Sequence, residues 1–538
     1  MQHDIILAAR KTGANSKSVR MLQRKLIKSI EGRMMAFKMV INNQGSRTPG
    51  VDGITYTKED FGSVVQQLGS VTNYWCKPVR RVYIPKANGK MRKLGIPCAI
   101  DRMYQALFQL ALAPLMCEVN DERSYGFVRG RTAWDAVSYL KIVLNRTDAA
   151  EWVVEADISS FFDNISHDWL LANIPMPYIG VLNSWLKAGV LEGDIYYDTL
   201  EGIPQGGVIS PTLANFVLAG LEKEILTKCG GRARAGRPGF RTYINRKVHV
   251  VRYADDFVVT CHKRFASINI IETIDEFLKP RGLELNKDKT KVTKVTDGFD
   301  FLGFNFRTWR NGFILTPTKA SIRRLTGKVK SVLDSTGKAP GQIVKELNPI
   351  LRGWANYYRV SSSTRTFSWV GWYVWHACFR WLKRKYPTAG KRMLYNEYFL
   401  RVGTTGGNRP LLFCPKALSD RVGDRYPVVN IAGIKTITFT KRLVDSSKNP
   451  YDLDCREYFD RRRVEMSILF SDSQSIHRRL LRRQRCICPV CEQIIDLEDR
   501  IEIDHIVPLK EGGLHKKSNM RLLHWDCHRT IVHGRERS

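Results

Sequence analysis

The chain has 538 residues, which is too long for one hydrophobic core, and about 150 residues per domain predicts three or four domains. Its hydrophobic content of 43% supplies packed cores and excludes a largely disordered protein. Lysine and arginine (86) outnumber aspartate and glutamate (52), for a net charge of +34. Such a charge repels itself, so nucleic acid is the expected partner, although a basic surface also simply promotes solubility.

Neither a membrane nor an oxidising compartment fits the sequence. The apolar run Ile5–Ala9 is too short for a secretion signal, and no stretch can span a bilayer, so we expect an intracellular protein with no membrane partner. Eight of the 12 cysteines are scattered and are expected to be buried thiols. The other four gather in the last tenth of the chain and favour metal ligation: Cys486, Cys488, Cys491 and Cys527.

The first predicted elements are helical. Apolar periodicity over residues 19–45 predicts a helix that leads into the loop Gly45–Gly53. From Arg80 the residues alternate, with a turn at Asn88-Gly89, which predicts a hairpin over residues 80–97 that carries basic side chains. Further helices are expected at 101–118 and 132–146.

Two apolar runs in the middle of the chain predict strands, Trp152–Ile158 and Val248–Thr260. The second run has a polar centre, which places Asp255 and Asp256 at the tip of a hairpin. Between the two strands, residues 232–247 contain six basic residues and no acid. This insert is either a loop that faces nucleic acid or a merely solvated loop.

The last third begins with a helical, aromatic stretch from about residue 315 to 385. Its aromatic residues, which include Trp369 and Trp381, either pack in a core or stack on bases. A less periodic stretch follows to about residue 475. Five arginines between Arg478 and Arg485 then lead into the cysteine cluster, and we interpret this segment as a linker or arm that touches a phosphate backbone.

Asp157 ends one predicted strand, and Asp255 and Asp256 lie nearly a hundred residues later. An isolated Asp-Asp pair is usually a turn or a helix cap. If the fold brings the three together, they form an acidic site in a basic molecule, and clustered carboxylates are normally tolerated around bound cations. The chemistry indicated is two-metal catalysis, in which paired Mg²⁺ ions activate a hydroxyl and stabilise a leaving phosphate.

The surroundings of these aspartates resemble conserved motifs of reverse transcriptases: Tyr253 to Asp256 (YADD), Asp157 to Asp163 (DISSFFD) and Gly202 to Pro211 (GIPQGGVISP). The resemblance implies that Asp157, Asp255 and Asp256 are the catalytic carboxylates, with the carbonyl of Ile158 near a metal.

The same resemblance implies a site for the incoming dNTP. Phe162 would be the gate that excludes a ribose 2'-hydroxyl, or else a core residue, and Gln205 would line the nucleotide pocket beside glycines that allow close backbone approach. Lys86 and Arg92 match the basic residues that hold the triphosphate. Lys90 and Arg81 are alternatives for that role.

Several blocks narrow the resemblance to group II intron-encoded proteins, over essentially the whole chain. They are Thr48–Gly53 (TPGVDG), Ser124–Arg131 (SYGFVRGR), Leu283–Lys291 (LELNKDKTK), Phe301–Phe304 (FLGF) and Leu351–Tyr358 (LRGWANYY). The last resembles domain X, the thumb and maturase helices. Membership implies that the protein binds its intron RNA tightly and helps it to fold for splicing.

The cysteine cluster reads C-x2-C at Cys488 and Cys491 and H-x2-C at His524 and Cys527, a structural Zn²⁺ pattern in which Cys486 could compete as a ligand. Asp504, His505 and Asn519 lie between the two pairs, and His528 directly follows Cys527. This order resembles HNH nucleases of the ββα-metal class. The resemblance implies that His505 is the general base, that Asn519 orients it, and that Asp504 and His528 hold a divalent metal, which we expect to be Mg²⁺. The alternative is a purely structural zinc ribbon.

The resulting prediction is a multidomain α+β protein. It has right-hand polymerase fingers and an antiparallel palm sheet (residues 1–314), an α-helical thumb or domain X (315–385), a DNA-binding region and linker (386–475) and a small zinc-stabilised HNH domain (476–538).

The implied reaction is target-primed reverse transcription, with intron RNA, double-stranded target DNA and dNTPs as partners. It would take place in a bacterial cytoplasm, at the nucleoid when the protein acts on DNA, or in an organelle. The alternatives are a retron-type or defence reverse transcriptase, and a splicing maturase without polymerase activity.

Overall fold

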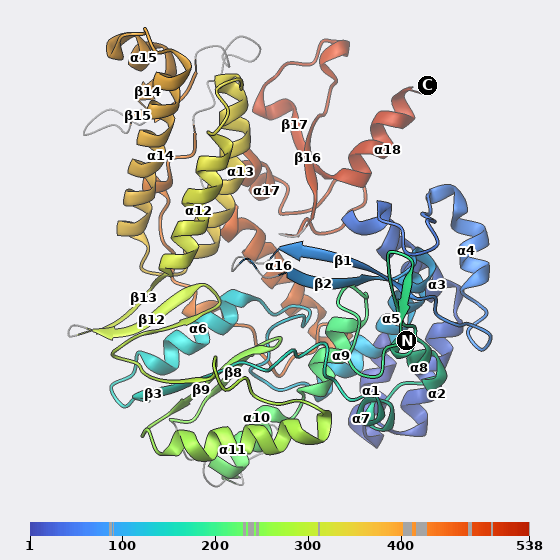
Figure 1. Ribbon diagram of the computed structural model, residues 1–538. Helices are drawn as coiled ribbons and strands as arrows, with labels where there is room; N and C mark the ends of the chain where they lie inside the picture. Colours follow the sequence, from blue (N-terminus) through green and yellow to red (C-terminus); the bar gives the residue numbers. More distant parts are fainter. Residues whose placement is uncertain are drawn as a thin grey trace. The chain divides into compact units, whose positions relative to one another are not determined.

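The computed structural model describes residues 1–85, 89, 91–229, 233–234, 242–243, 247–309, 312–401, 411–415, 428–471, 476–496 and 499–536. The chain divides into two compact units. The first comprises residues 1–301, 308–313 and 442–456, and the second comprises 302–307, 314–441 and 457–538 (Figure 1).

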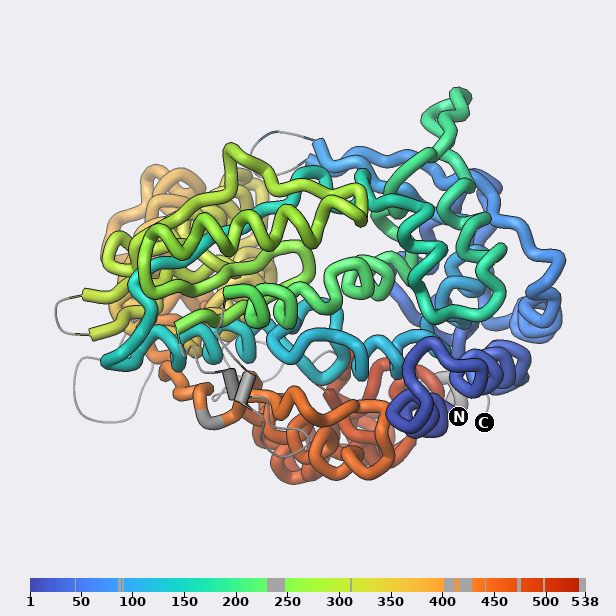
Figure 2. Tube along the Cα trace, turned by 90° about the horizontal axis from the view of Figure 1, so that it is seen from below, coloured from blue at the N-terminus to red at the C-terminus, as the bar shows by residue number. Residues whose placement is uncertain are grey.

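The N-terminal part of the first unit is built around one long helix, α5 (Ala99–Val119), most of whose residues are buried. Helices α1 (Gln2–Thr12), α2 (Lys17–Lys28) and α3 (Ile30–Ile41) all contact α5, and they lie beside it in Figure 2. The first unit also contains the shorter helices α4 (Phe61–Gln67), α6 (Ala133–Leu144), α7 (His167–Asn173), α8 (Ile179–Leu186) and α9 (Ser210–Val217). Helices α5 and α6 confirm the predictions for 101–118 and 132–146.

The prediction of one helix over residues 19–45 was wrong, because the chain breaks at Ser29. This residue is extended (φ −71°, ψ 146°), and its hydroxyl donates to the Leu26 carbonyl and accepts from the Gly32 N–H. Ser29 therefore ends α2 and begins α3. The change of direction leaves Ile30 exposed, although it fits the apolar periodicity of α2.

The hairpin predicted over residues 80–97 is confirmed. β1 (Val79–Pro85) pairs antiparallel with β2 (Met91–Ile96), and Ile84 lies opposite Arg92. β1 also pairs in parallel with β4 (Val190–Glu192), which pairs with β5 (Ile195–Tyr197), so the sheet order is β2-β1-β4-β5.

A second sheet of four antiparallel strands has the order β10-β3-β9-β8. Its strands are β3 (Trp152–Ala156), β8 (Val250–Tyr253), β9 (Asp256–Cys261) and β10 (Lys291–Lys294). Helix α11 (Ala266–Leu278) contacts β3 and β9 and packs against α10 (Leu221–Cys229). Both strand predictions are thereby confirmed, and the second one is a hairpin. Most of the insert 232–247 lies outside the described residues.

Strands β11 (Phe299–Phe301), β12 (Phe304–Trp309) and β13 (Gly312–Pro317) lie in sequence at the boundary of the units. The second unit continues with α12 (Lys319–Val332), α13 (Pro340–Tyr358) and α14 (Thr364–Lys385), which confirm the helical stretch 315–385. After them come α15 (Lys391–Tyr398), β14 (Phe399–Arg401) and β15 (Leu411–Phe413). None of the described helices is long and apolar enough to cross a membrane.

The C-terminal part of the second unit contains α16 (Arg456–Phe470), α17 (Ile476–Arg483), the antiparallel pair β16 (Ile501–His505) and β17 (Met520–His524), and α18 (Trp525–Glu536). The segment Arg478–Arg485 is thus not a free linker or arm. Leu480 and Leu481 of α17 are buried in the core of this part, and Arg483 donates to the Met520 carbonyl. The paired leucines hold the arginine-rich segment against β17, which the count of arginines did not reveal.

Candidate active site and metal centre

The four-stranded antiparallel sheet brings the three predicted catalytic aspartates to one end. Strands β3 and β9 are neighbours with Ala156 opposite Phe257, so Asp157 follows β3 beside Asp256, the first residue of β9. Asp255 lies in the tight turn between β8 and β9. The sheet therefore joins residues that are nearly a hundred positions apart in sequence.

These carboxylates repel one another. Burial and the negative charges of Asp255, Asp157 and Glu155 raise the pKa of Asp256 to about 7. One compensating charge comes from Lys289, whose Nζ lies 2.9 Å from Asp157 Oδ2. Both side chains of this pair are well exposed, so the pair is weak and can open for another cation.

The YADD turn rests on a buried arginine that sequence reasoning missed. The Arg252 guanidinium is almost completely buried and donates to the Ala254 carbonyl (3.2 Å) and to Asn215 Oδ1 (3.0 Å). Burial lowers its pKa to about 10, so it stays charged at neutral pH. Ala254 is left-handed (φ 58°), and a Cβ on Gly126 would lie 2.3 Å from its nitrogen. The SYG motif thus packs directly against the YADD turn.

Two of the predicted nucleotide-binding residues are in contact. Arg92 Nε donates to Gln205 Oε1 at 2.9 Å, and the Gly95 N–H donates to the Gln205 carbonyl at 2.8 Å. Gly206 has φ 129°, and a Cβ there would lie 2.6 Å from the Gly95 carbonyl oxygen. The glycine beside Gln205 therefore does allow the expected close approach of backbone.

The structure also describes Phe162 and Ile158, two more residues predicted to lie at the nucleotide site. Phe162 is half-buried, its ring meets Phe161 edge to face at 5.2 Å, and its carbonyl accepts from the Ile203 N–H at 2.7 Å. Ile158 is buried and forms an antiparallel bridge with Leu285.

Two of the four basic residues considered for the triphosphate, Lys86 and Lys90, lie outside the described residues. Arg81 is opposite Gly95 in the β1–β2 register, so it lies on the other face of the hairpin from Arg92.

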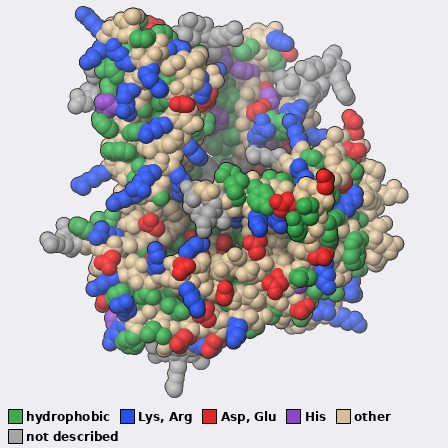
Figure 3. Space-filling view, viewed as in Figure 1, with side chains coloured by type: hydrophobic (Ala, Val, Ile, Leu, Met, Phe, Trp, Pro, Cys, Tyr) green, Lys and Arg blue, Asp and Glu red, His purple; other side chains and the backbone are tan. Residues whose placement is uncertain are grey.

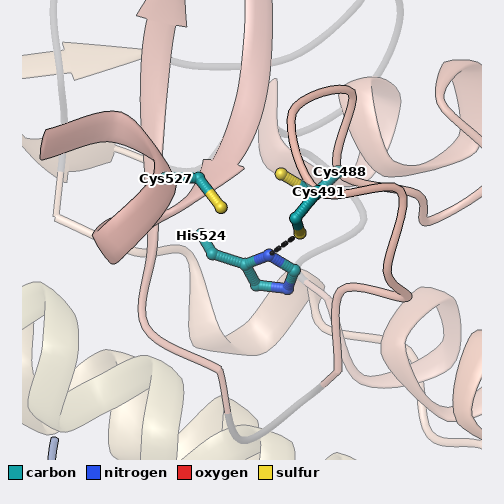
Figure 4. Close-up of side chains that lie close together, drawn as sticks. All are labelled: Cys488, Cys491, His524 and Cys527. Carbon is teal, nitrogen blue, oxygen red and sulfur yellow. Dashed lines mark hydrogen bonds between the residues drawn. The ribbon is translucent and has the colours of Figure 1, made fainter. Parts of the chain in front are cut away.

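The predicted zinc ligands converge. Cys488 and Cys491 lie in the turns after α17, His524 ends β17 and Cys527 lies in the first turn of α18 (Figure 4). Their ligand atoms are all within 4.8 Å of one another, which fits tetrahedral zinc. Within the described part of the chain, this is the one group of three or more His, Cys, Asp or Glu ligands gathered so closely.

The neighbours of the cluster support ligation. Burial opposes ionisation of Cys488, but backbone N–H groups of Cys491, His524 and Val490 lower its pKa to about 7, toward the thiolate that binds metal. His524 Nε2 lies 3.2 Å from Asp499 Oδ2, a carboxylate that can orient the ring. Cys486 is buried beside the cluster but is not part of it.

The predicted nuclease base, His505, ends β16, and its Nε2 lies 3.0 Å from His515 Nδ1. Asn519 acts on the backbone that follows His505. Its amide nitrogen donates to the Val507 and Leu514 carbonyls (2.9 and 3.0 Å), and its oxygen accepts from the Val507 N–H (2.8 Å). It therefore closes the loop between the two strands.

Strand β16 and helix α18 also bring Asp504 and His528 together, with His528 Nε2 3.7 Å from Asp504 Oδ1. Two partners were missed. His528 Nδ1 lies 2.6 Å from Glu502 Oε2, and Arg521 Nη2 lies 2.9 Å from Asp504 Oδ2. The period of two along β16 could have indicated Glu502, which shares a face with Asp504, whereas Arg521 is the cross-strand partner of Asp504 and needs the register.

Four protein families match successive parts of the chain. Residues 1–68 match the N-terminal domain of reverse transcriptase, and residues 84–306 match reverse transcriptase (RNA-dependent DNA polymerase). Residues 322–399 match the group II intron, maturase-specific domain, and residues 488–533 match HNH endonuclease.

Known proteins show the same relationship. The chain is 34% identical to Protein YkfC of Escherichia coli (strain K12) over 314 residues, which cover 52% of this chain and 81% of YkfC. It is 27% identical to the group II intron-encoded protein LtrA of Lactococcus lactis subsp. cremoris over 440 residues, 65% of this chain and 72% of LtrA. The chain therefore belongs to the group II intron-encoded proteins, as a reverse transcriptase and maturase with an HNH endonuclease domain.

Proposed function

We propose that Asp157, Asp255 and Asp256 form the polymerase centre and hold Mg²⁺, with the carbonyl of Ile158 as a further ligand. The observation that carries this proposal is the meeting of the three carboxylates at one end of the β3–β9 sheet. Burial and the repulsion between the carboxylates raise the pKa of Asp256 to about 7, and bound cations would favour its ionised form. Bound Mg²⁺ supplies activation of the primer hydroxyl and neutralises charge on the transferred phosphate.

Around this centre, Arg92 and Lys86 would hold the triphosphate of a dNTP, Gln205 would line its pocket and Phe162 would exclude a 2'-hydroxyl. The contact between Arg92 and Gln205 supports a shared pocket, because it joins the two motifs that carry these roles. The Phe162 carbonyl accepts a hydrogen bond from the N–H of Ile203, which is close in sequence to Gln205. This bond connects the segment of the proposed gate to the segment of the proposed pocket wall.

In the C-terminal part, His505 would take a proton from the attacking water. Asn519 would hold the loop that follows it, Asp504 and His528 would hold a divalent metal, and Cys488, Cys491, His524 and Cys527 would hold a structural Zn²⁺. The short distance between His528 and Asp504 and the closely gathered cluster support these roles.

The full cycle that we infer is intron mobility by target-primed reverse transcription. The protein would bind its intron RNA and assist splicing, the HNH domain would nick double-stranded target DNA, and the new 3'-hydroxyl would prime synthesis from dNTPs. In this scheme residues 1–314 are fingers and palm, 315–385 the thumb, 386–475 the DNA-binding region and 476–538 the nuclease domain.

Primer extension on an RNA template with Mg²⁺ tests the polymerase centre. Asp255→Ala should abolish extension, whereas Asp163→Asn, which changes an exposed acid of the same motif, should retain it. Loss of activity in both variants, or in neither, would contradict the assignment. A wild-type protein that binds RNA and extends no primer would favour a maturase without polymerase activity.

Nicking of DNA tests the second centre separately. His505→Ala should abolish nicking by the ribonucleoprotein and leave primer extension intact, because the two sites are built from different parts of the chain. Nicking that persists in this variant would remove His505 from the role of general base.

A further inference from the structure

Helix α14 exposes two large aromatic side chains. Trp369 is 45% exposed and Trp372 is 58% exposed, whereas Trp381 on the same helix is completely buried. Residues 365, 369, 372, 376 and 380 follow one another at steps of three or four, so they share one face of the helix. We call the side chains of Trp369, Trp372, Tyr373 and His376 the aromatic stripe.

The rings of the stripe are paired along the helix. Trp369 and Tyr373 are stacked, with centroids 5.6 Å apart and planes at 19°. The ring centroids of Trp372 and His376 are 4.4 Å apart. These contacts restrict the rotamers of the exposed tryptophans, so less conformational entropy is lost when a ligand binds their free faces. An exposed pair of tryptophans leaves apolar area in water that a partner can cover.

The charge around the stripe is positive. Helix α14 contains five lysines and arginines and no aspartate or glutamate. Arg365 and Arg380 stand at the two ends of the stripe, are exposed, and have no acidic partner among the described residues. Figure 3 shows hydrophobic and Lys or Arg side chains interspersed over the region of α12, α14 and α15. Free cations beside exposed rings suit a ligand that carries both phosphates and bases.

Trp372 also borders an apolar cavity. The cavity has a volume of about 280 Å³ and lies between α14 and the short helix η5 (Ile431–Gly433), with Trp375 and Val429 among its lining residues. The apolar surface available next to the stripe is therefore larger than the two exposed rings alone.

We propose that the aromatic stripe binds unpaired bases of the RNA by stacking, with Arg365 and Arg380 on the flanking phosphates. The proposal rests on the RNA-binding role of the maturase, whose matched domain, residues 322–399, contains the whole of α14. Paired bases cannot use the stripe, because the faces of bases in a duplex are already stacked. The surface thus selects single-stranded or looped RNA.

The test measures binding of the full-length protein to three labelled probes: a short oligoadenylate RNA, a fully paired RNA duplex of equal length, and the matching oligodeoxyadenylate. Each of Trp369→Ala and Trp372→Ala should weaken binding of the single-stranded RNA about tenfold and leave duplex binding unchanged. Replacement by phenylalanine should restore most of the affinity. Phe265→Ala, at an aromatic side chain 67% exposed in the first unit, is the control for loss of an exposed ring.

Salt dependence separates the two kinds of contact. The tryptophan variants should keep the wild-type slope of log affinity against log salt, whereas Arg365→Ala and Arg380→Ala should each reduce the slope by about one. Equal losses on duplex and single strand, a loss confined to the DNA strand, or no loss at all would overturn the proposal. If wild type binds none of the probes, the RNA-binding function itself fails, which is a distinct result from a variant that binds like wild type.

Discussion

Arg92 Nε donates a hydrogen bond to Gln205 Oε1 at 2.9 Å, and this bond joins a strand of the hairpin to a loop 113 residues later. If the two side chains share the dNTP pocket, their effects on nucleotide binding are coupled. Arg92→Ala should raise the KM for dNTP about tenfold to a hundredfold, since a charged hydrogen bond contributes about 1.5–3 kcal/mol. Primer extension at varied dNTP concentration measures this.

A double-mutant cycle then tests the contact itself. The effect of the double variant should differ by about 1 kcal/mol from the sum of the effects of Arg92→Ala and Gln205→Ala, as is usual for residues in contact. Lys93→Ala is the matched control, because Lys93 is next to Arg92 on the same strand and lies on the opposite face. Additive effects, or an equal rise in KM for the control, would speak against a shared pocket.

Phe162→Val should relax sugar selectivity. The smaller side chain would make room for a 2'-hydroxyl, so the preference for dNTP over rNTP should fall by up to about a hundredfold, the range over which an apolar wall discriminates a hydroxyl. Competitive incorporation on one template measures the ratio. Phe161→Leu is the control, since Phe161 is buried and should change stability without changing selectivity. Unchanged selectivity in Phe162→Val would return Phe162 to a packing role.

Cys488→Ser should release zinc. Purified wild-type protein should contain one zinc per chain by elemental analysis, and the variant should bind it about a hundredfold or more weakly, since even outer partners of a metal site contribute that much. DNA nicking should disappear while primer extension remains. Cys486→Ser is the matched control, because Cys486 is buried two residues away and outside the cluster. A zinc content that falls with Cys486 and not with Cys488 would reassign the ligands.

Glu222 should make stability fall as pH rises. Burial and the nearby Asp121 raise the pKa of Glu222 to about 8, so the folded state favours the protonated carboxyl. A raised carboxyl pKa stabilises the fold fully below the unfolded pKa of about 4.3, and this stabilisation is lost between there and about pH 8. Glu222→Gln keeps an acceptor for the Arg123 N–H and cannot ionise.

Thermal melts at about pH 5.5 and about pH 8.5 measure the effect. The variant should gain about 1–3 kcal/mol over wild type at the higher pH and less at the lower pH, since each pKa unit corresponds to about 1.4 kcal/mol. Glu224→Gln, at an exposed acid paired with Lys228, should show no such pH dependence. A difference that is constant with pH would mean that Glu222 is already neutral or already charged throughout.

Local patterns in the sequence determined much of what was found. The hairpin of residues 80–97 follows from alternation and a turn, helix α6 from its apolar periodicity, and the convergence of Cys488, Cys491, His524 and Cys527 from their spacing. Each of these features depends on residues close together in the chain. The family resemblance likewise depended on the order of short motifs.

Tertiary contacts decided the rest. Trp369 and Trp381 are the same type of residue on the same helix, yet Trp369 is exposed and Trp381 is buried. Burial depends on what packs against each face of α14. The burial of Arg252 beneath the YADD turn depends on Asn215 and on the SYG segment, which are distant in sequence. The raised pKa of Glu222 likewise depends on burial and on Asp121, which is distant in sequence. Residue type and local spacing specify an element, whereas the dielectric and the charges around a side chain are properties of the assembled fold.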